Sequence, residues 1–568
     1  MTPVTIKNIR PAKIVTAFVV VMMSSFFLFF NLGHYALWDD EADTALFAES
    51  VWRTGDTFAM LDHNLIAHTN GQELKNLYNR YIPPLSFYLA APFVGLAPGS
   101  AFAARLPFAV CGLLTVLLML FWLARAGASV STWLLMSAGI LGNVSLMLYF
   151  RQCRYYSPSI LAATALAYLY VYRDSRKRTL LATALVSLML LASNFMFYVA
   201  VYACIVVDYL LWGRKIRSLS YSDLAVIFVP QIILGGLLIS VYNLLGEKVG
   251  ANYNTLLWLT DKINMVFWNI REINSCEHGV GILIVLAPFL YFISRDKRLL
   301  RCSMAIFVYA VVIAFLAPKP FEGYNMATVR YLAVVIPICI YTSVLSIQAL
   351  TGRAKWLAVP LAVLAFGTNA LHGGPLVGVD NKAMFSKIIA HGRIRSTVVE
   401  FTRELMDPPP SAYRATADWI NVNLKENETV WVMPDFATYP LMFHAPRALY
   451  AWQIRPHFAD WYAFYRAPED MFEEQLKKRK EGQFKGLPEI HFYGQIPPDY
   501  VIAFGPHAVL ADTSMKRLRK RGVHYAMAKQ IGLYWYDLIR PELFWHSFRE
   551  IKDFSRASEA IYIFKRLD

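Results

Sequence analysis

The sequence is poor in charged residues and in cysteine. Only 17% of its 568 residues are charged, 57% are hydrophobic, and the mean hydropathy is +0.38. This balance exceeds the apolar share of a soluble domain and predicts a polytopic α-helical membrane protein. The six cysteines end at Cys339, and none lies in a Cys-x-x-Cys spacing. A disulfide framework in the tail and a cysteine-bound zinc site are therefore excluded.

Repeats and low-complexity tracts are absent as well, which excludes a solenoid. The formal net charge is +15. A nucleic-acid-binding stripe is nevertheless excluded, because the basic residues lie in short runs between apolar segments and in the tail. In a membrane protein, such a distribution is an orientation signal.

Apolar runs of membrane-spanning length fill the first two thirds of the chain. The first covers residues 14–32 and has no small-x-small cleavage site after it, so we interpret it as a retained span rather than a signal peptide. Together with this span, the pattern predicts about eleven transmembrane helices. The other runs cover residues 103–124, 130–149, 158–172, 179–194, 196–212, 222–245, 279–294, 302–317, 330–350 and 355–371.

The loops between these runs differ in charge. With the N-terminus in the cytoplasm, every short basic cluster lies inside, as the positive-inside rule requires. We therefore expect a transmembrane domain, residues 1–372, with an outer-face loop at 33–100, and a soluble extracytoplasmic domain, residues 373–568. Helical and strand patterns alternate in this tail and predict an α/β domain. They indicate a helix at 415–424 and strands at 429–433, 500–504, 533–536 and 560–564.

The first outer loop begins with a dense group of carboxylates, Asp39, Asp40, Glu41 and Asp43, at the membrane boundary. Carboxylates are costly there unless they have a partner or a role. They precede a helical pattern at 42–53, so helix capping is one interpretation. Because capping needs fewer acids, we assign function to Asp40 and Glu41, and capping or solvation to Asp39 and Asp43. His63 and His68 are interpreted as ordinary loop histidines, since no third ligand has a metal-site spacing.

Basic and aromatic residues occupy the outer loops that follow. Guanidinium groups bind phosphate in a bidentate way, and aromatic rings suit the headgroup level or a sugar face. We expect these segments to converge on the carboxylates around a lipid-borne phosphate, although Arg151 and Arg154 could instead anchor a helix end by snorkelling. The candidate substrate-binding residues are Arg80, Arg151, Arg154, Tyr155, Lys319, Arg330 and Tyr331.

Four motifs follow one another along the outer loops of the chain. They are Asp40-Glu41, Pro83-Pro84, Arg151-x-x-Arg154-Tyr155-Tyr156 and Arg330-Tyr331-Leu332. In this order and placement they resemble the family 39-type membrane glycosyltransferases of the C-fold (GT-C), which include protein O-mannosyltransferases and bacterial lipid A aminoarabinose transferases. One departure concerns the residue before the Pro-Pro pair. The aminoarabinose transferases have a lysine at this position, whereas this sequence has Ile82. Arg80 lies two residues earlier and could replace that cation.

The resemblance implies an enzyme of the bacterial inner (plasma) membrane, with its C-terminal domain outside. It implies transfer of a sugar, with inversion, from a polyprenyl-phosphate carrier to a glycan, lipid or protein acceptor on the outer face. Asp40 would be the base, with Glu41 beside it. Arg330, and then Arg151 and Arg154, would bind the carrier phosphate.

Physical chemistry is consistent with this assignment. A sugar on a lipid phosphate already has a leaving group, so one base and a cationic cradle are sufficient for a single displacement. Asp39, Asp40 and Glu41 could ligate a divalent cation. Arginines can replace such a cation, however, so we expect no cofactor and an enzyme that works without a metal. The alternative is a lipid-linked sugar transporter or flippase, which requires charge at the midplane and an internal repeat. Within the spans there is almost no charge beyond Asp208, which lies near the inner end of its run, and no repeat is present. A third hypothesis is a non-catalytic scaffold with the tail as a binding module. This hypothesis does not explain why acidic and basic loops lie on the same side of the membrane.

Overall fold

The computed structural model describes residues 11–243, 255–317, 326–352, 354–372, 394, 396–408, 410–456, 469–533 and 559–567. The chain forms two compact units. We call residues 1–31, 108–407 and 541–550 the helical unit, and residues 32–107, 408–540 and 551–568 the α/β unit. This division differs from the one expected from the sequence, because the first outer loop folds with the tail rather than with the spans.

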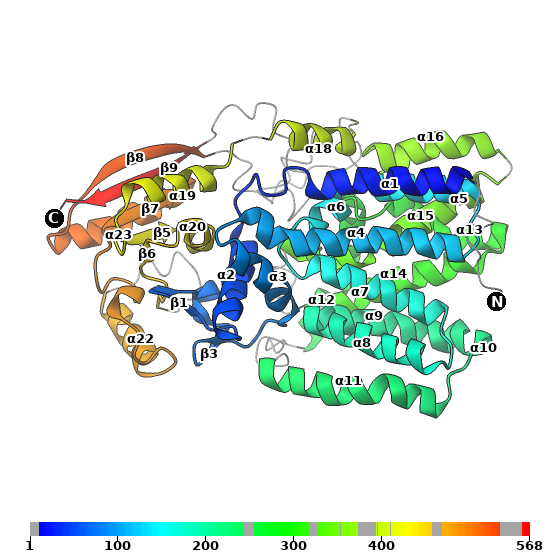
Figure 1. The fold of residues 1–568 in the computed structure, drawn as a ribbon, viewed down its shortest axis with the longest axis horizontal. Helices are drawn as coiled ribbons and strands as arrows, with labels where there is room; N and C mark the ends of the chain where they lie inside the picture. Colours follow the sequence, from blue (N-terminus) through cyan, green and yellow to red (C-terminus); the bar gives the residue numbers. More distant parts are fainter. Residues whose placement is uncertain are drawn as a thin grey trace. The chain divides into compact units, whose positions relative to one another are not determined.

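The helical unit consists of long apolar helices that run alongside one another (Figure 1). Within the described residues, six helices are long and apolar enough to cross a membrane, or seven if one bent pair counts as a single span. The chain is thus a multi-pass membrane protein. The expected number of about eleven also included shorter apolar helices. The main helices are α1 (Pro11–Phe29), α4 (Ala101–Arg125), α5 (Val130–Gly142), α6 (Val144–Phe150), α7 (Tyr156–Val171), α8 (Lys177–Ser193), α9 (Phe195–Asp208), α11 (Tyr221–Tyr242), α12 (Thr255–Ser275), α13 (Gly281–Ser294), α14 (Lys297–Leu316), α15 (Ile336–Leu350), α16 (Ala358–Ala362) and α18 (Thr397–Met406).

The bent pair is α5 and α6, which meet at 61° around Asn143. The Asn143 side chain accepts a hydrogen bond from the Leu146 amide at 2.8 Å, which caps α6. Its amide group donates to the Glu277 carbonyl at 2.9 Å. Asparagine can satisfy both demands, because its side chain carries an acceptor and two donors. The break places the Arg151–Tyr156 motif directly after the short helix α6.

The first outer loop forms a small subdomain of the α/β unit. It contains the long helix α2 (Asp39–Thr54), two short hairpins, the 3₁₀ turn η2 (His68–Gly71) and helix α3 (Leu85–Leu96). The hairpins pair β1 (Met60–Leu61) with β2 (Asn64–Leu65) and β3 (Leu74–Lys75) with β4 (Tyr78–Asn79). Helices α2 and α3 pack closely, since a Cβ at Gly95 would lie 2.2 Å from the Trp52 ring. Helix α2 lies where the sequence predicts a helix, at 42–53.

The tail builds a five-stranded sheet in the order β6-β5-β7-β9-β8 (Figure 1). Strands β6, β5 and β7 are parallel, and β9 and β8 are added antiparallel. Strands β5 and β7 have the bounds expected from the sequence, and most of the strand expected at 533–536 lies outside the described residues. The elements are α19 (Ala412–Asn423), β5 (Thr429–Met433), α20 (Thr438–His444), β6 (Leu449–Tyr450), α22 (Glu469–Glu481), β7 (Tyr500–Phe504), α23 (Ala508–Lys520), β8 (Tyr525–Leu533) and β9 (Glu559–Arg566).

Buried hydrogen bonds attach the first outer loop to this sheet. The Asn64 amide group donates to the Ala448 carbonyl at 2.9 Å, and its oxygen accepts from the Tyr450 amide at 2.8 Å. The buried His444 side chain provides a second attachment. Its Nε2 accepts from the Leu37 amide at 3.1 Å, and its Nδ1 lies 2.9 Å from the Gly99 carbonyl. The loop and the sheet therefore fold as one body.

The His444 attachment predicts a dependence of stability on pH. Burial, together with the charges of Arg414 and Arg105, lowers the pKa of His444 to about 3. In the unfolded chain the ring has the usual pKa of about 6.5. The folded state therefore has its full stability above about pH 6.5. As the pH falls toward 3, the free energy of unfolding decreases by up to a few kcal/mol, because the unfolded state binds the extra proton. We expect the thermal midpoint of the full-length protein to fall over this range.

The variant His444→Gln should flatten that pH dependence, because glutamine keeps a donor and an acceptor but does not titrate in this range. The matched control is His63→Gln in the same loop, since the His63 side chain is exposed. An unchanged slope in His444→Gln, measured by thermal unfolding between pH 4 and 8, would contradict this account.

Candidate active site

The carboxylate group lies in the first turn of α2, and most of it is buried. Glu41 and Asp43 have no exposed surface, and Asp40 is 7% exposed. The positive end of the helix dipole favours anions at this position. Burial of several carboxylates is nevertheless costly without cationic partners. Arg105 and His68 are such partners among the residues that the structure describes.

Arg105 holds Glu41. Its Nε and one terminal nitrogen donate to the two carboxylate oxygens at 2.9 and 2.5 Å. The remaining donors bond the carbonyls of Leu32, Tyr35 and Ala36 at 2.9–3.1 Å. Glu41 also accepts the Trp38 amide at 3.4 Å, which is half of a capping box. This places Glu41 in the framework of the helix start, rather than beside Asp40 as a second acid that faces substrate.

Sequence reasoning missed Arg105, which we treated as part of an apolar run. The signal that could have revealed it is a lone arginine in the first turns of a predicted span. Such a charge requires a buried partner.

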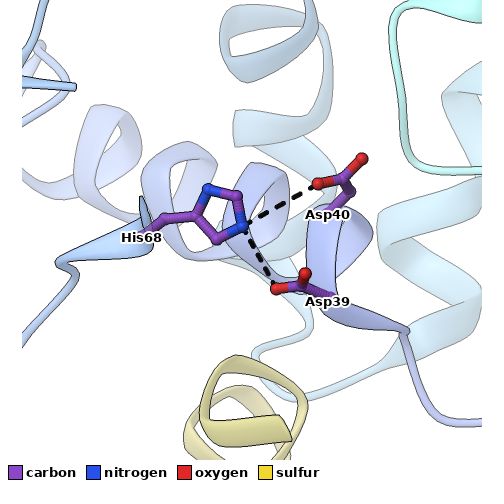
Figure 2. A group of neighbouring side chains, drawn as sticks. All are labelled: Asp39, Asp40 and His68. Carbon is purple, nitrogen blue, oxygen red and sulfur yellow. Dashed lines mark ion pairs between the residues drawn. The ribbon is translucent and has the colours of Figure 1, made fainter. Parts of the chain in front are cut away.

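His68 faces the other carboxylates (Figure 2). Its Nε2 lies 3.2 Å from Asp39 and 3.8 Å from Asp40, and its Nδ1 lies 3.8 Å from Glu73. The sequence-based interpretation of His68 as an ordinary loop histidine is therefore wrong, because the hairpins that flank η2 turn its ring onto α2. Asp39, which we expected only to cap or to be solvated, is the closest of these carboxylates to the ring.

The imidazole and the carboxylates influence each other's protonation. Burial works against the charged ring, but the charges of Asp39 and Asp43, with hydrogen bonds that the ring donates to Asp39 and Glu73, raise the pKa of His68 well above its usual value. Burial also raises the pKa of Asp39, although His68 partly offsets this rise. The neighbouring carboxylates therefore favour the protonated form of the His68 ring.

Two sets of three side chains in this cluster have the spacing of a metal site. They are Asp39, Asp40 and His68, and Asp43, His68 and Glu73, with ligand atoms within 4.8 Å of one another in each set. Oxygen-rich sets with one imidazole suit a hard or borderline divalent cation. Both sets share His68. A metal ion bound to one of the ring nitrogens would replace the proton on that nitrogen.

The basic candidates lie in different surroundings. Arg80 belongs to the α/β unit and forms a bidentate pair with Asp56 at 2.6 and 2.9 Å. Arg151 belongs to the helical unit and donates to the carbonyls of Phe27, Leu28 and Phe30, which end α1. These contacts give both arginines a structural role. Arg80 neutralises a loop carboxylate, and Arg151 donates hydrogen bonds to the free carbonyls at a helix end.

Arg154, Tyr155, Arg330 and Tyr331 lie together within the helical unit. Each arginine lies over the neighbouring tyrosine ring, at 5.1 and 5.6 Å respectively. The rings of Tyr155 and Tyr331 each contact Phe197, at 5.8 and 6.4 Å, and Tyr155 is within electrostatic range of both arginines. We call these four residues the arginine–tyrosine cluster.

Two expectations remain predictions. Lys319 lies outside the described residues. The carboxylates belong to the α/β unit and the arginine–tyrosine cluster to the helical unit, so their expected convergence is untested.

The sequence matches no protein-family model and no curated protein. Its fold, however, is similar to that of solved membrane proteins. ArnT from Cupriavidus metallidurans bound to undecaprenyl phosphate aligns with a TM-score of 0.53 at 12% identity, covering 96% of this chain and 97% of ArnT. The apo state of the same protein gives a TM-score of 0.54 at 12% identity, with 97% of both chains covered.

At this identity the likeness defines the fold alone. The chain is a polytopic membrane protein with the GT-C fold of membrane glycosyltransferases. The fold named in the sequence-based resemblance is thereby confirmed.

Proposed function

We propose that this protein is an inverting glycosyltransferase that moves a sugar from a polyprenyl-phosphate carrier to an acceptor on the outer face of the membrane. One observation carries the proposal: a buried carboxylate, Asp40, lies beside the imidazole of His68 in a GT-C fold. A solved protein of the same fold holds undecaprenyl phosphate. We place the enzyme in the bacterial plasma membrane, with the α/β unit outside.

The proposed reaction is a single displacement. Asp40 accepts the proton of the attacking group, whose oxygen forms the new bond to the anomeric carbon as the bond to the carrier phosphate breaks. Glu41 acts as a positioning residue, because Arg105 fixes it in the first turn of α2. The arginine–tyrosine cluster binds the carrier phosphate and stabilises its growing charge.

The direct test mixes the purified protein with radiolabelled polyprenyl-phosphate sugars and a membrane extract. We expect label in an acceptor, and far less label in the same time with the Asp40→Asn variant. Label that crosses the bilayer of a proteoliposome without bond cleavage would instead identify a transporter.

The carrier site gives a separate prediction. Replacement of Arg330 by alanine should weaken binding of undecaprenyl phosphate by about 10- to 100-fold, because a hydrogen bond to a charged group contributes roughly 1.5–3 kcal/mol. Microscale thermophoresis with a labelled protein measures this change. Arg298→Ala is the matched control, since that exposed arginine of α14 pairs with Asp296. Equal affinities for the two variants would remove Arg330 from the carrier site.

We further propose that transfer requires no divalent cation. Both ring nitrogens of His68 face carboxylates, and only the imidazolium can donate from both. We therefore expect transfer to continue unchanged in EDTA. Loss of activity in EDTA and its return with Mn²⁺ or Zn²⁺ would show instead that the two ligand sets hold a metal.

A further inference from the structure

The carboxyl ends of the parallel strands form a second group of polar side chains in the α/β unit. From β5 the chain moves to one neighbour, β6, and then crosses to β7 on the other side. Such a reversal of direction leaves a crevice at the carboxyl edge of the sheet, where open α/β sheets bind ligands. Asp435 follows β5, Gln453 and Arg455 follow β6, and His507 follows β7.

Side chains from all three strand ends meet at this edge. Arg455 forms an ion pair with Asp435, and the rings of Phe436 and His507 lie edge to face at 6.2 Å. The Tyr439 hydroxyl donates to Gln453 at 3.3 Å. A small cavity of about 10 Å³, large enough for one water-sized group, lies among them. Its polar lining consists of Asp435, Thr438, Tyr439, Gln453 and Arg455.

This cavity adjoins the carboxylate cluster of α2. Ala67, the neighbour of His68, lines the cavity. The ring of Tyr439 packs edge-on against the ring of His68 at 5.4 Å. The Tyr439 hydroxyl is within electrostatic range of Asp39 and Asp43 as well as of Asp435. The Tyr439 side chain thus contacts both His68 and Gln453 at the sheet edge.

Further hydrogen bonds hold the two walls together. Asn70 accepts from the Arg455 amide at 2.8 Å and donates to its carbonyl at 3.1 Å. Arg479 donates to the carbonyls of both residues, at 2.6 and 2.8 Å. The turn that carries His68 is therefore fixed on the strand end that carries Arg455.

The charges that line the cavity cancel. Its charged lining residues, Asp435 and Arg455, form an ion pair with each other, so the lining offers a phosphate or carboxylate group no net positive charge. A neutral polyol would instead find carboxylate, amide, guanidinium and hydroxyl groups, each able to bond a hydroxyl. The side chains of Asp435, Tyr439, Gln453 and Arg455 offer more hydrogen-bond partners than a single serine or threonine hydroxyl can use. The adjacent hydroxyl groups of a sugar can bond several of them at once.

We propose that the carboxyl edge of strands β5 and β6, with Asp435, Gln453 and Arg455, is the acceptor site, and that the acceptor is a neutral saccharide. This inference rests on the proposed transferase function and specifies its acceptor. The saccharide binds along the strand ends, and the hydroxyl that will be glycosylated points past Tyr439 toward Asp40.

The first test separates the acceptors of a membrane extract by anion exchange. The full-length protein is given a radiolabelled polyprenyl-phosphate sugar and either the neutral or the anionic fraction. We expect label in the neutral fraction, in a product that resists protease. Label confined to anionic products, or to products that protease degrades, overturns the inference but leaves the transferase intact. Absence of transfer to any fraction by the wild-type protein overturns the proposed function itself.

The second test uses the near-isosteric variants Asp435→Asn and Gln453→Met. The KM for the neutral acceptor should rise by about tenfold or more in each, because a site built to hydrogen-bond hydroxyl groups loses them as partners. Binding of undecaprenyl phosphate should stay unchanged, which also reports that the variants are folded. Asp512→Asn on α23, whose partner is Lys516, is the control. An unchanged acceptor KM in both variants overturns the site.

Discussion

Asp40→Asn is expected to lower the transfer rate by about 10²- to 10⁴-fold, the usual contribution of a positioned general base. Asparagine keeps the shape of the side chain but cannot accept the proton. The substitution also removes one charge next to His68, so binding of undecaprenyl phosphate should be measured in parallel. Unchanged carrier binding together with lost transfer would locate the defect in the chemical step. Single-turnover transfer with a radiolabelled donor is the appropriate measurement.

Two further variants make this result specific. Asp62→Asn removes a carboxylate of the same loop that pairs with Arg53 at the surface, and it should leave transfer unchanged. Asp39→Asn tests the carboxylate closest to His68. If Asp39→Asn abolishes transfer while Asp40→Asn retains it, the base is Asp39 and the assignment of Asp40 is wrong.

Local patterns in the sequence predicted much of the secondary structure. A short apolar run that ends before Pro434 gave the bounds of β5, and a similar run gave those of β7. Helical spacing after the carboxylates placed α2. These features depend on the period of the side chains along a helix or strand, which a single sequence displays directly.

Partners that are distant in the sequence could not be predicted in this way. His68 lies 28 positions after Asp40, and two hairpins with no strong strand pattern bring it back to α2. Asn64 bonds the strand β6 across 386 positions. No periodicity records such contacts, so the sequence-based division kept the outer loop with the spans.

The roles of the charged residues were the least predictable feature. The sequence shows that carboxylates and arginines are present, but it does not show which of them neutralise one another. Glu41 is held by an arginine from an apolar run, and Arg80 by Asp56. Burial decides this pairing, because a charge that is removed from water must find a partner within the fold. Fewer of the predicted site residues therefore keep a proposed role in the reaction, since Glu41, Arg80 and Arg151 have structural partners instead.

Arg105→Ala is expected to have the largest effect on stability. The substitution leaves Glu41 as a buried charge and removes the donors that satisfy three backbone carbonyls before α2. Breaking a buried ion pair by removal of one partner costs about 3–5 kcal/mol. We therefore expect a clear fall in the unfolding midpoint of the detergent-solubilised, full-length protein, together with loss of transfer, because the turn that presents Asp40 is no longer fixed.

Arg53→Ala is the matched control on the same helix. Arg53 pairs with Glu49 and Asp62, but its side chain is 42% exposed, so its loss should cost at most about 1 kcal/mol. The double variant Glu41→Gln with Arg105→Met removes both charges and should recover part of the lost stability, since it leaves no buried charge unpaired. If Arg105→Ala unfolds at the same midpoint as Arg53→Ala, the buried pair does not hold the start of α2. The role of Glu41 would then have to be sought in the reaction, as the sequence first suggested.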